Sequence, residues 1–328
     1  MRLVYEPWRP ELADRDVVVV DGKASRGLHL SHWGGNRTPR EFYADTSAEM
    51  ALKFLAAPNR EDYLGGATGV TNNHFDEDGL TGVWAMLHPE AALARRQRLV
   101  NLATTGDFGV FTSEDAFRSV ATVSAMHTPG RSPFARSLAT ARDYLHATEI
   151  NFREMLPRFQ AIVDEPERFE SYWRDEWKVF VRSVELFAKG HATVEEKPAL
   201  ALSIVRTTEK LDATALNTFA SGDRVVEIVE GGPVSFHYKY YSWVEVTHQP
   251  PPRVDLAPLR DLLNEHEVGR PWSWDGVDRV VPSLAFEPAG ENAVPCMGGE
   301  ATARLIHDFL RDHAADPTLR FTPDMLRF

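Results

Sequence analysis

The first half of the chain alternates short β-branched runs with helical hydrophobic patterns. Residues 16–21 form the continuous run Asp-Val-Val-Val-Val-Asp, which is typical of a strand that helices cover on both faces. A second strand is predicted at 67–73, and a helix at 47–57 begins after the capping box of Thr46 and Glu49. Strands that alternate with helices indicate a parallel sheet. We therefore predict an α/β fold in which helices flank a mainly parallel sheet.

Hydrophobic spacing of three and four residues predicts further helices in the middle of the chain. The predicted features are helices at 80–103, 113–126 with Thr112 as cap, 133–164 with a break at Pro157, and 166–189 before Gly190. The aromatic residues of the last helix recur at helical spacing, so we interpret them as core and not as a cofactor stack.

The C-terminal part is richer in strand patterns. A strand is predicted at 199–206, and a hairpin at 224–230 and 234–247 encloses Gly231 and Gly232. Helices are predicted at 259–267 and 301–314 after a proline-rich linker, with a tryptophan-rich loop between them. The change in pattern predicts two regions: an α/β domain at 1–195 that carries the candidate metal site, and a smaller α+β region at 196–328 packed on it.

An acidic turn, His74-Phe-Asp-Glu-Asp-Gly79, follows the second predicted strand, and we expect Gly79 to let the backbone turn sharply into the next helix. On an extended segment, alternation places His74, Asp76 and Asp78 on one side. One imidazole and two carboxylates suit a divalent metal ion, which would offset the repulsion between the acids. Asp107, after the following helix, is the next candidate ligand. We predict a site for Mn²⁺ or Mg²⁺ first, with Fe²⁺ or Zn²⁺ as alternatives.

Of three other interpretations of this turn, two stay open and one is excluded. Asp76 and Asp78 would act only as caps if the turn merely started the helix at Leu80. A calcium-binding EF-hand is excluded, because with Gly79 at loop position six the twelfth position is Ala85 and not Glu. A non-haem iron oxygenase would use the His74 and Asp76 pair with a distant histidine, for which His127 is the candidate.

Further polar candidates lie in loops on either side of the acidic turn. If the first two strands are parallel neighbours, the loop after the first strand faces the same crevice as the turn. We predict His32 and His127 as catalytic proton carriers. Candidate residues for binding an anionic substrate are Trp33, Asn36, Arg37, Asn73 and Arg131.

Composition narrows the class of protein. A net charge of −12 argues against general binding to nucleic acid or to an anionic membrane. Cys296 is the single cysteine, so neither an intramolecular disulfide nor a cysteine-rich zinc site can form. The sequence shows no export signal and no long apolar run, so we expect a cytoplasmic protein that acts on a small molecule. The pattern leaves the oligomeric state open.

The acidic turn resembles the first motif of the DHH phosphoesterase superfamily, in which a strand ends in His-x-Asp-x-Asp-Gly and the acids bind two Mn²⁺ or Mg²⁺ ions. By this resemblance Asp107 would take the second acidic position. The chain departs from the family in lacking an Asp-His-His triplet and in having Gly82 where serine is frequent.

A longer resemblance is to an uncharacterised bacterial family that pairs the acidic turn with the stretch at 29–39, His-Leu-Ser-His-Trp-Gly-Gly-Asn-Arg-Thr-Pro. From the candidate residues we expect a metal-dependent, phosphoesterase-like hydrolase. The alternatives are a non-haem iron oxygenase that uses His74, Asp76 and a distal histidine, and a non-catalytic binding protein.

Overall fold

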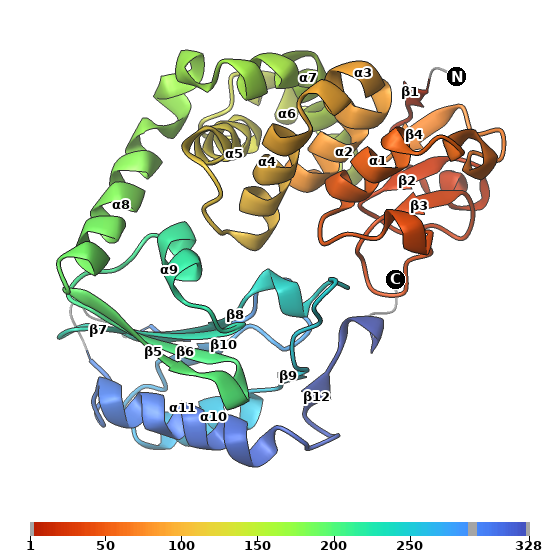
Figure 1. The fold of residues 1–328 in the computed structure, drawn as a ribbon. Helices are drawn as coiled ribbons and strands as arrows, with labels where there is room; N and C mark the ends of the chain where they lie inside the picture. The colour runs from red at the N-terminus through yellow and green to blue at the C-terminus, as the bar shows by residue number, and fades with distance from the viewer. Residues whose placement is uncertain (1–2, 288–293, 326–328) are drawn as a thin grey trace. The chain divides into compact units, whose positions relative to one another are not determined.

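The computed structural model describes residues 3–287 and 294–325 of the chain (Figure 1). The chain divides into two compact units, Met1–Lys178 and Val179–Arg327. This division falls within helix α8 (Glu170–Ala188), whereas the sequence pattern placed the boundary after residue 195. Among the described residues, no helix has both the length and the apolar character needed to cross a membrane.

The first unit contains a parallel sheet, as predicted. Its four strands lie in the order β1-β4-β2-β3, and each neighbouring pair is parallel. The bounds are β1 Val4–Tyr5, β2 Val18–Val20, β3 Leu28–Leu30 and β4 Gly69–Thr71. Together with the helices, this sheet confirms the α/β fold class. Because the strands are parallel, their carboxyl ends meet at one edge of the sheet.

Among the residues that the structure describes, seven α-helices of the first unit precede α8. They are α1 Ser47–Ala56, α2 Glu77–Leu87, α3 Pro89–Ala94, α4 Arg96–Phe108, α5 Glu114–His127, α6 Ala135–Leu138 and α7 Tyr144–Asp164. The prediction of Thr112 as the cap of α5 was wrong, because the Ser113 side chain accepts the hydrogen bond from Ala116 N. The predicted break at Pro157 was also wrong. That proline lies inside α7, where the burial of Phe152, Met155 and Phe159 offsets the roughly 3 kcal/mol cost of an interior proline.

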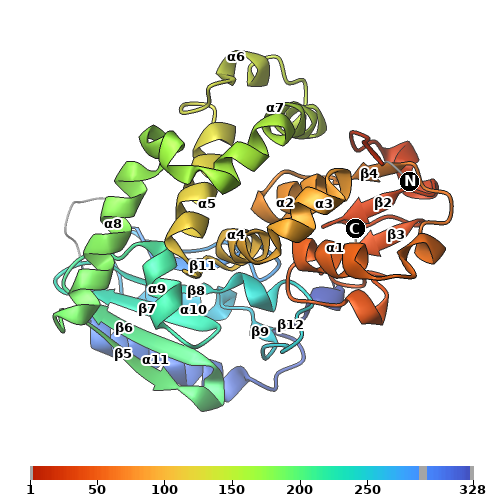
Figure 2. The same cartoon turned by 45° about the horizontal axis from the view of Figure 1, so that its top comes forward.

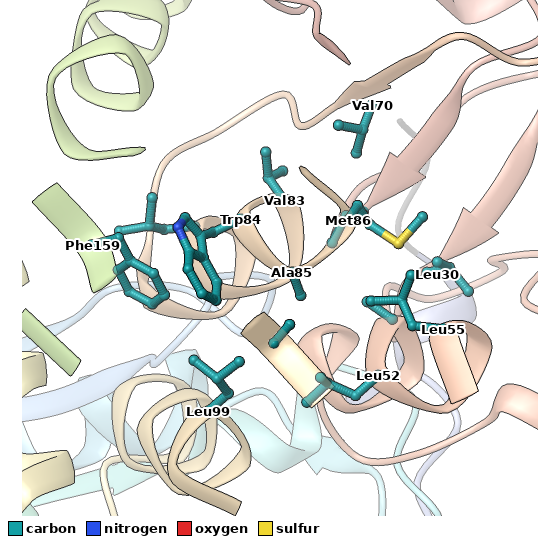
Figure 3. Packing of buried hydrophobic residues seen from close by; sticks show 14 of the residues in the cluster. Leu30, Leu52, Leu55, Val70, Val83, Trp84, Ala85, Met86, Leu99 and Phe159 are labelled. Atoms are coloured by element: carbon teal, nitrogen blue, oxygen red, sulfur yellow. The ribbon is translucent and has the colours of Figure 1, made fainter. Parts of the chain in front are cut away.

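Helix α2 lies at the centre of the apolar core of this unit (Figure 3). Val83 and Trp84 of α2 are fully or almost fully buried, and Figure 3 shows Leu52 of α1 and Leu99 of α4 around this helix. Gly82 permits close contact with the sheet, since a Cβ atom there would lie 2.4 Å from Val20 Cγ1. The packing of α2 therefore fixes the segment that leads into it, which is the acidic turn.

The second unit is built on a mixed sheet, which agrees with the predicted β-rich C-terminal region. Its strand order is β10-β11-β8-β7-β6-β5, and β6 and β7 pair in parallel while the other neighbours are antiparallel. The strands are β5 Ala192–Lys197, β6 Leu202–Thr207, β7 Arg224–Val229, β8 Val234–Tyr238, β10 Trp272–Trp274 and β11 Ser283–Phe286. A separate pair joins β9 Arg253–Val254 to β12 Arg320–Phe321.

The described part of this unit also contains the end of α8 and the helices α9 Ala213–Phe219, α10 Ala257–Glu265 and α11 Gly299–His313 (Figure 2). Strand β8 ends nine residues before the predicted end at 247, because Tyr240–Ser242 turn into a short 3-10 helix. The segment interpreted as a tryptophan-rich loop contains β10.

Candidate metal centre

Three neighbouring strands of the parallel sheet deliver acidic and imidazole side chains to one edge. Asp21 follows β2, His32 lies two residues after β3, and the acidic turn follows β4. Since β4, β2 and β3 are adjacent and parallel, these three chain segments converge. The edge of the sheet thus gathers side chains that are far apart in the sequence.

The gathered side chains form two groups that share Asp21. In the first group, His74 Nε2 lies 2.7 Å from Asp76 Oδ2 and 3.1 Å from Asp21 Oδ2. In the second group, His32 Nε2 lies 3.3 Å from Asp21 Oδ1 and 3.9 Å from Asp78 Oδ2. Within each group the ligand atoms lie within 4.8 Å of one another, so each could hold a metal ion. The two oxygens of Asp21 face the two histidines separately.

Asp21 is the member of the centre that sequence reasoning missed. It was interpreted only as the end of a strand, yet its side chain is completely buried. Its φ of 51° is unusual for a residue other than glycine, and such a conformation costs on the order of 1–3 kcal/mol. The available signal was an acid at the carboxyl end of a fully apolar strand. That signal acquires meaning only when the neighbouring strand is known.

The second group is supported by the first turn of α1. Both oxygens of Asp78 accept backbone hydrogen bonds there, from Ser47 N at 2.7 Å and from Ala48 N at 2.8 Å. His32 Nδ1 lies 2.6 Å from the carbonyl oxygen of Asp45, which requires the proton on Nδ1. Nε2 then faces the carboxylates, and once it loses its proton to a metal ion it would have the arrangement found for metal-bound histidines.

The first group combines a helix cap with an imidazole pair. Asp76 Oδ1 accepts the backbone hydrogen bond of Gly79 at 2.8 Å and so caps α2, while its Oδ2 faces His74. The Trp33 ring lies 5.0 Å from the His74 ring, centroid to centroid, and Asn73 Oδ1 lies 3.0 Å from His74 Nδ1. The capping interpretation of Asp76 therefore accounts for one of its two oxygens.

Asp107 approaches the second group from α4. Its Oδ2 lies 3.4 Å from His32 Nε2, and its side chain is 4% exposed. Among the described residues, Asp107 Oδ2 and Asp21 Oδ2 are buried and accept no well-formed hydrogen bond, although His32 Nε2 and His74 Nε2 lie near them. Buried carboxylate oxygens normally have a partner. A bound cation would be a suitable partner for either of these two oxygens.

Burial and the crowding of charges shift the pKa values of several members of the centre. Burial, added to the charge of Asp21, raises the pKa of Asp78 to about 7, and burial with Asp78 raises the pKa of Asp107 well above its usual range. Burial lowers the pKa of His32, but the hydrogen bond and charge of Asp21 outweigh it and raise that pKa to about 9. Burial likewise opposes a charged His74, yet Asp76 and Asp21 raise its pKa well above the ordinary value. Without a cation, the cluster therefore retains protons.

Two predicted substrate residues, Trp33 and Asn73, lie against His74, and Asn36 shapes the loop beside them. The Asn36 amide donates to Trp33 O at 2.9 Å, and its oxygen accepts from Thr38 N at 2.8 Å. These contacts hold the loop that carries Trp33. Substrate binding by Asn36 remains a prediction.

Three further predicted residues lie outside the two ligand groups: His127 ends α5, and Arg37 and Arg131 lie in loops. The His127 ring packs edge-on against Phe75 with centroids 5.5 Å apart, and burial lowers its pKa. Arg37 is exposed and donates to Ala24 O at 3.0 Å. Arg131 pairs with Glu176 at the start of α8. The structure thus records none of these three side chains in contact with the described ligand atoms.

A protein-family model, the family of unknown function DUF6687, matches residues 1–295. The chain therefore belongs to this family, which confirms the expectation of an uncharacterised family. Neither the curated proteins nor the solved structures gave a match.

Proposed function

We propose that this member of the DUF6687 family is a hydrolase that uses two divalent metal ions to cleave a phosphoester bond of a small anionic substrate. The observation that carries the proposal is the sharing of Asp21 between two ligand groups. A carboxylate with one oxygen directed to each of two positions is suited to bridge a pair of ions. Paired ions about 3.5–4 Å apart are characteristic of enzymes that hydrolyse phosphate esters.

The residues fit two ions in number and in charge. His74, Asp76 and Asp21 Oδ2 would hold the first, and His32, Asp78 and Asp21 Oδ1 would hold the second, with Asp107 beside it. Four carboxylates carry four negative charges when ionised, which two divalent cations neutralise. The predominance of oxygen donors favours Mn²⁺ or Mg²⁺ over Zn²⁺ and Fe²⁺. When bound, such ions supply a water of lowered pKa and polarise the phosphoryl oxygen.

The chain's own residues divide the remaining tasks. The contacts of His32 favour the role of a ligand, because its Nδ1 is engaged by Asp45 and its Nε2 faces acids. His127 is the better proton carrier, since burial keeps it neutral and it packs on Phe75, the residue between His74 and Asp76. Arg37 is the candidate for holding the anionic part of the substrate.

The iron oxygenase makes a different prediction. It requires one Fe²⁺ held by two histidines and one carboxylate, and its reaction consumes O₂. Of the histidines proposed for that site, His127 belongs to neither ligand group among the described residues. The third candidate, a non-catalytic binding protein, predicts no hydrolysis and no metal requirement.

The proposal is tested by elemental analysis and hydrolysis of bis(p-nitrophenyl) phosphate after loading with Mn²⁺. Asp21→Asn removes the shared charge, while Asp16→Asn is the matched control, because Asp16 lies on the same chain segment just before β2 and is exposed. We expect about two equivalents of Mn²⁺ in the wild type and in Asp16→Asn, and strong loss of both ions and of hydrolysis in Asp21→Asn. A wild type that takes up no metal, or an Asp21→Asn variant that keeps both ions, would overturn the proposal.

A further inference from the structure

Ser47, the first residue of α1, is completely buried and contacts every member of the second ligand group. Its hydroxyl donates to Asp21 Oδ1 at 2.8 Å, and its backbone N–H donates to Asp78 Oδ2 at 2.7 Å. The backbone N–H of His32 donates to the same hydroxyl oxygen at 3.3 Å. One residue outside the ligand set thus joins the ends of β2 and β3 to the start of α2.

The start of α1 does not itself require this hydroxyl. Thr46 already caps the helix by accepting the hydrogen bond of Glu49 N at 3.2 Å. Alanine is the better helix former at an ordinary helical position. The Ser47 hydroxyl therefore serves the ligand group and not the helix.

The hydroxyl also decides how Asp21 can be shared. Its hydrogen bond occupies one lone pair of Oδ1 and fixes the carboxylate plane, so that Oδ2 faces His74. Loss of that bond would free the carboxylate to rotate toward one position. Partners that orient a ligand in this way typically change metal affinity by about 10–100-fold.

We infer that Ser47 is a positioning residue that holds Asp21 and His32 for the second metal ion. The inference rests on the proposed two-metal hydrolase and adds a residue that the hydrolase proposal does not use. In this role, the first turn of α1 raises the affinity of the second position for its metal ion.

The test measures Mn²⁺ binding to the full chain by titration, together with the electron paramagnetic resonance spectrum of the bound ions. Ser47→Ala removes the hydroxyl but keeps the backbone hydrogen bond to Asp78. Ser119→Ala is the matched control, because Ser119 is equally buried and donates to Ile162 O within the same unit. We expect the control to bind both ions as the wild type does, with the spectrum of a coupled pair.

In Ser47→Ala we expect the first ion to bind as before and the second to bind about 10–100-fold more weakly. At limiting Mn²⁺ the spectrum of this variant should be that of isolated ions. The spectrum of the coupled pair should return when the Mn²⁺ concentration is raised by the factor by which the affinity for the second ion has fallen. A role in folding alone would not give this concentration-dependent rescue. If Ser47→Ala does not fold, Ser47→Cys puts a somewhat larger side chain with a weaker donor at the same position and should show the same loss.

The outcomes separate the two proposals. A coupled pair in the wild type with unchanged affinity in Ser47→Ala or Ser47→Cys overturns the role of Ser47 and leaves the hydrolase standing. A wild type that never binds two ions overturns the hydrolase proposal, and the positioning role fails with it.

Discussion

Gly79, which ends the acidic turn, tests whether the packing around the centre has been interpreted correctly. The sequence suggested that this glycine lets the backbone turn sharply, but it lies inside the first turn of α2 and its φ is not positive. The structure gives a different reason, which is space. A Cβ atom on Gly79 would lie 2.2 Å from Asn72 Nδ2 and 3.1 Å from Asp76 Oδ1.

The expected cost of Gly79→Ala follows from these neighbours. At an open helical position, glycine to alanine stabilises by about 1 kcal/mol. Here Asn72 is fully buried and its Oδ1 accepts the backbone hydrogen bond of His74 at 2.7 Å, so the amide cannot move away freely. Overpacking costs about 1–3 kcal/mol, and breaking the hydrogen bond about 1 kcal/mol more. The net expectation is a destabilisation of about 1–3 kcal/mol.

Urea unfolding followed by circular dichroism measures this change. Gly130→Ala is the control, because a Cβ atom there meets nothing within 4 Å. The double variant Asn72→Ala, Gly79→Ala should be less destabilised than the sum of the two single variants, because the first change removes the collision caused by the second. A Gly79→Ala protein as stable as the wild type, or more stable, would refute this account of the turn.

Three further predictions follow from the same contacts. Burial raises the pKa of Glu77 to about 8 and that of Asp78 to about 7. Burial lowers the pKa of His32, but Asp21 outweighs burial and raises it to about 9. The folded metal-free protein therefore binds these protons more tightly than the unfolded chain does. Thermal unfolding in EDTA should therefore show stability falling as pH rises from about 6 to about 9, and Mn²⁺ should restore more of it at higher pH. His127→Gln should lower kcat about 100-fold and leave the metal content unchanged, as elemental analysis beside the hydrolysis assay would show. Arg131→Ala removes a largely exposed ion pair with Glu176, so a change in unfolding free energy above about 1 kcal/mol, or any loss of metal, would contradict its place outside the centre.

Local patterns were sufficient to predict much of the fold and part of the centre. The β-branched run of β2 and the acidic turn before α2 carry their signals within a few residues, and both were predicted. His74, Asp76 and Asp78 were singled out because they alternate along one segment. The expectation that alternation places all three on one side was wrong, because Asp78 lies inside α2 and belongs to a different ligand group from His74 and Asp76.

Asp21 and Ser47 were missed because their roles depend on strand order. Asp21 acquires its partners only when β2 lies between β4 and β3, and that order is a property of the folded sheet. Ser47 resembles an ordinary residue in a capped helix until its hydroxyl is seen to bond Asp21. The proline in α7 was misjudged for a related reason, since tertiary burial outweighed a local rule.

Structural roles alone leave part of the cluster without an explanation. Asp76 Oδ1 caps α2, and both oxygens of Asp78 bind the first turn of α1. Asp107 is different, because its Oδ2 is buried without a hydrogen bond among the described residues and its pKa is raised well above the ordinary value by burial and by neighbouring acids.

A buried carboxyl group reduces the stability of the metal-free protein when burial and neighbouring acids disfavour its ionised form. Asp107→Asn should therefore raise the melting temperature in EDTA and weaken the uptake of the second Mn²⁺ ion. Those opposite signs are expected only if the carboxylate is kept for a cation. Calorimetry of the metal-free protein and Mn²⁺ titration measure the two changes. If Asp107→Asn lowers the melting temperature and leaves Mn²⁺ binding unchanged, Asp107 is a structural residue, and the second position is held by Asp21, His32 and Asp78 without it.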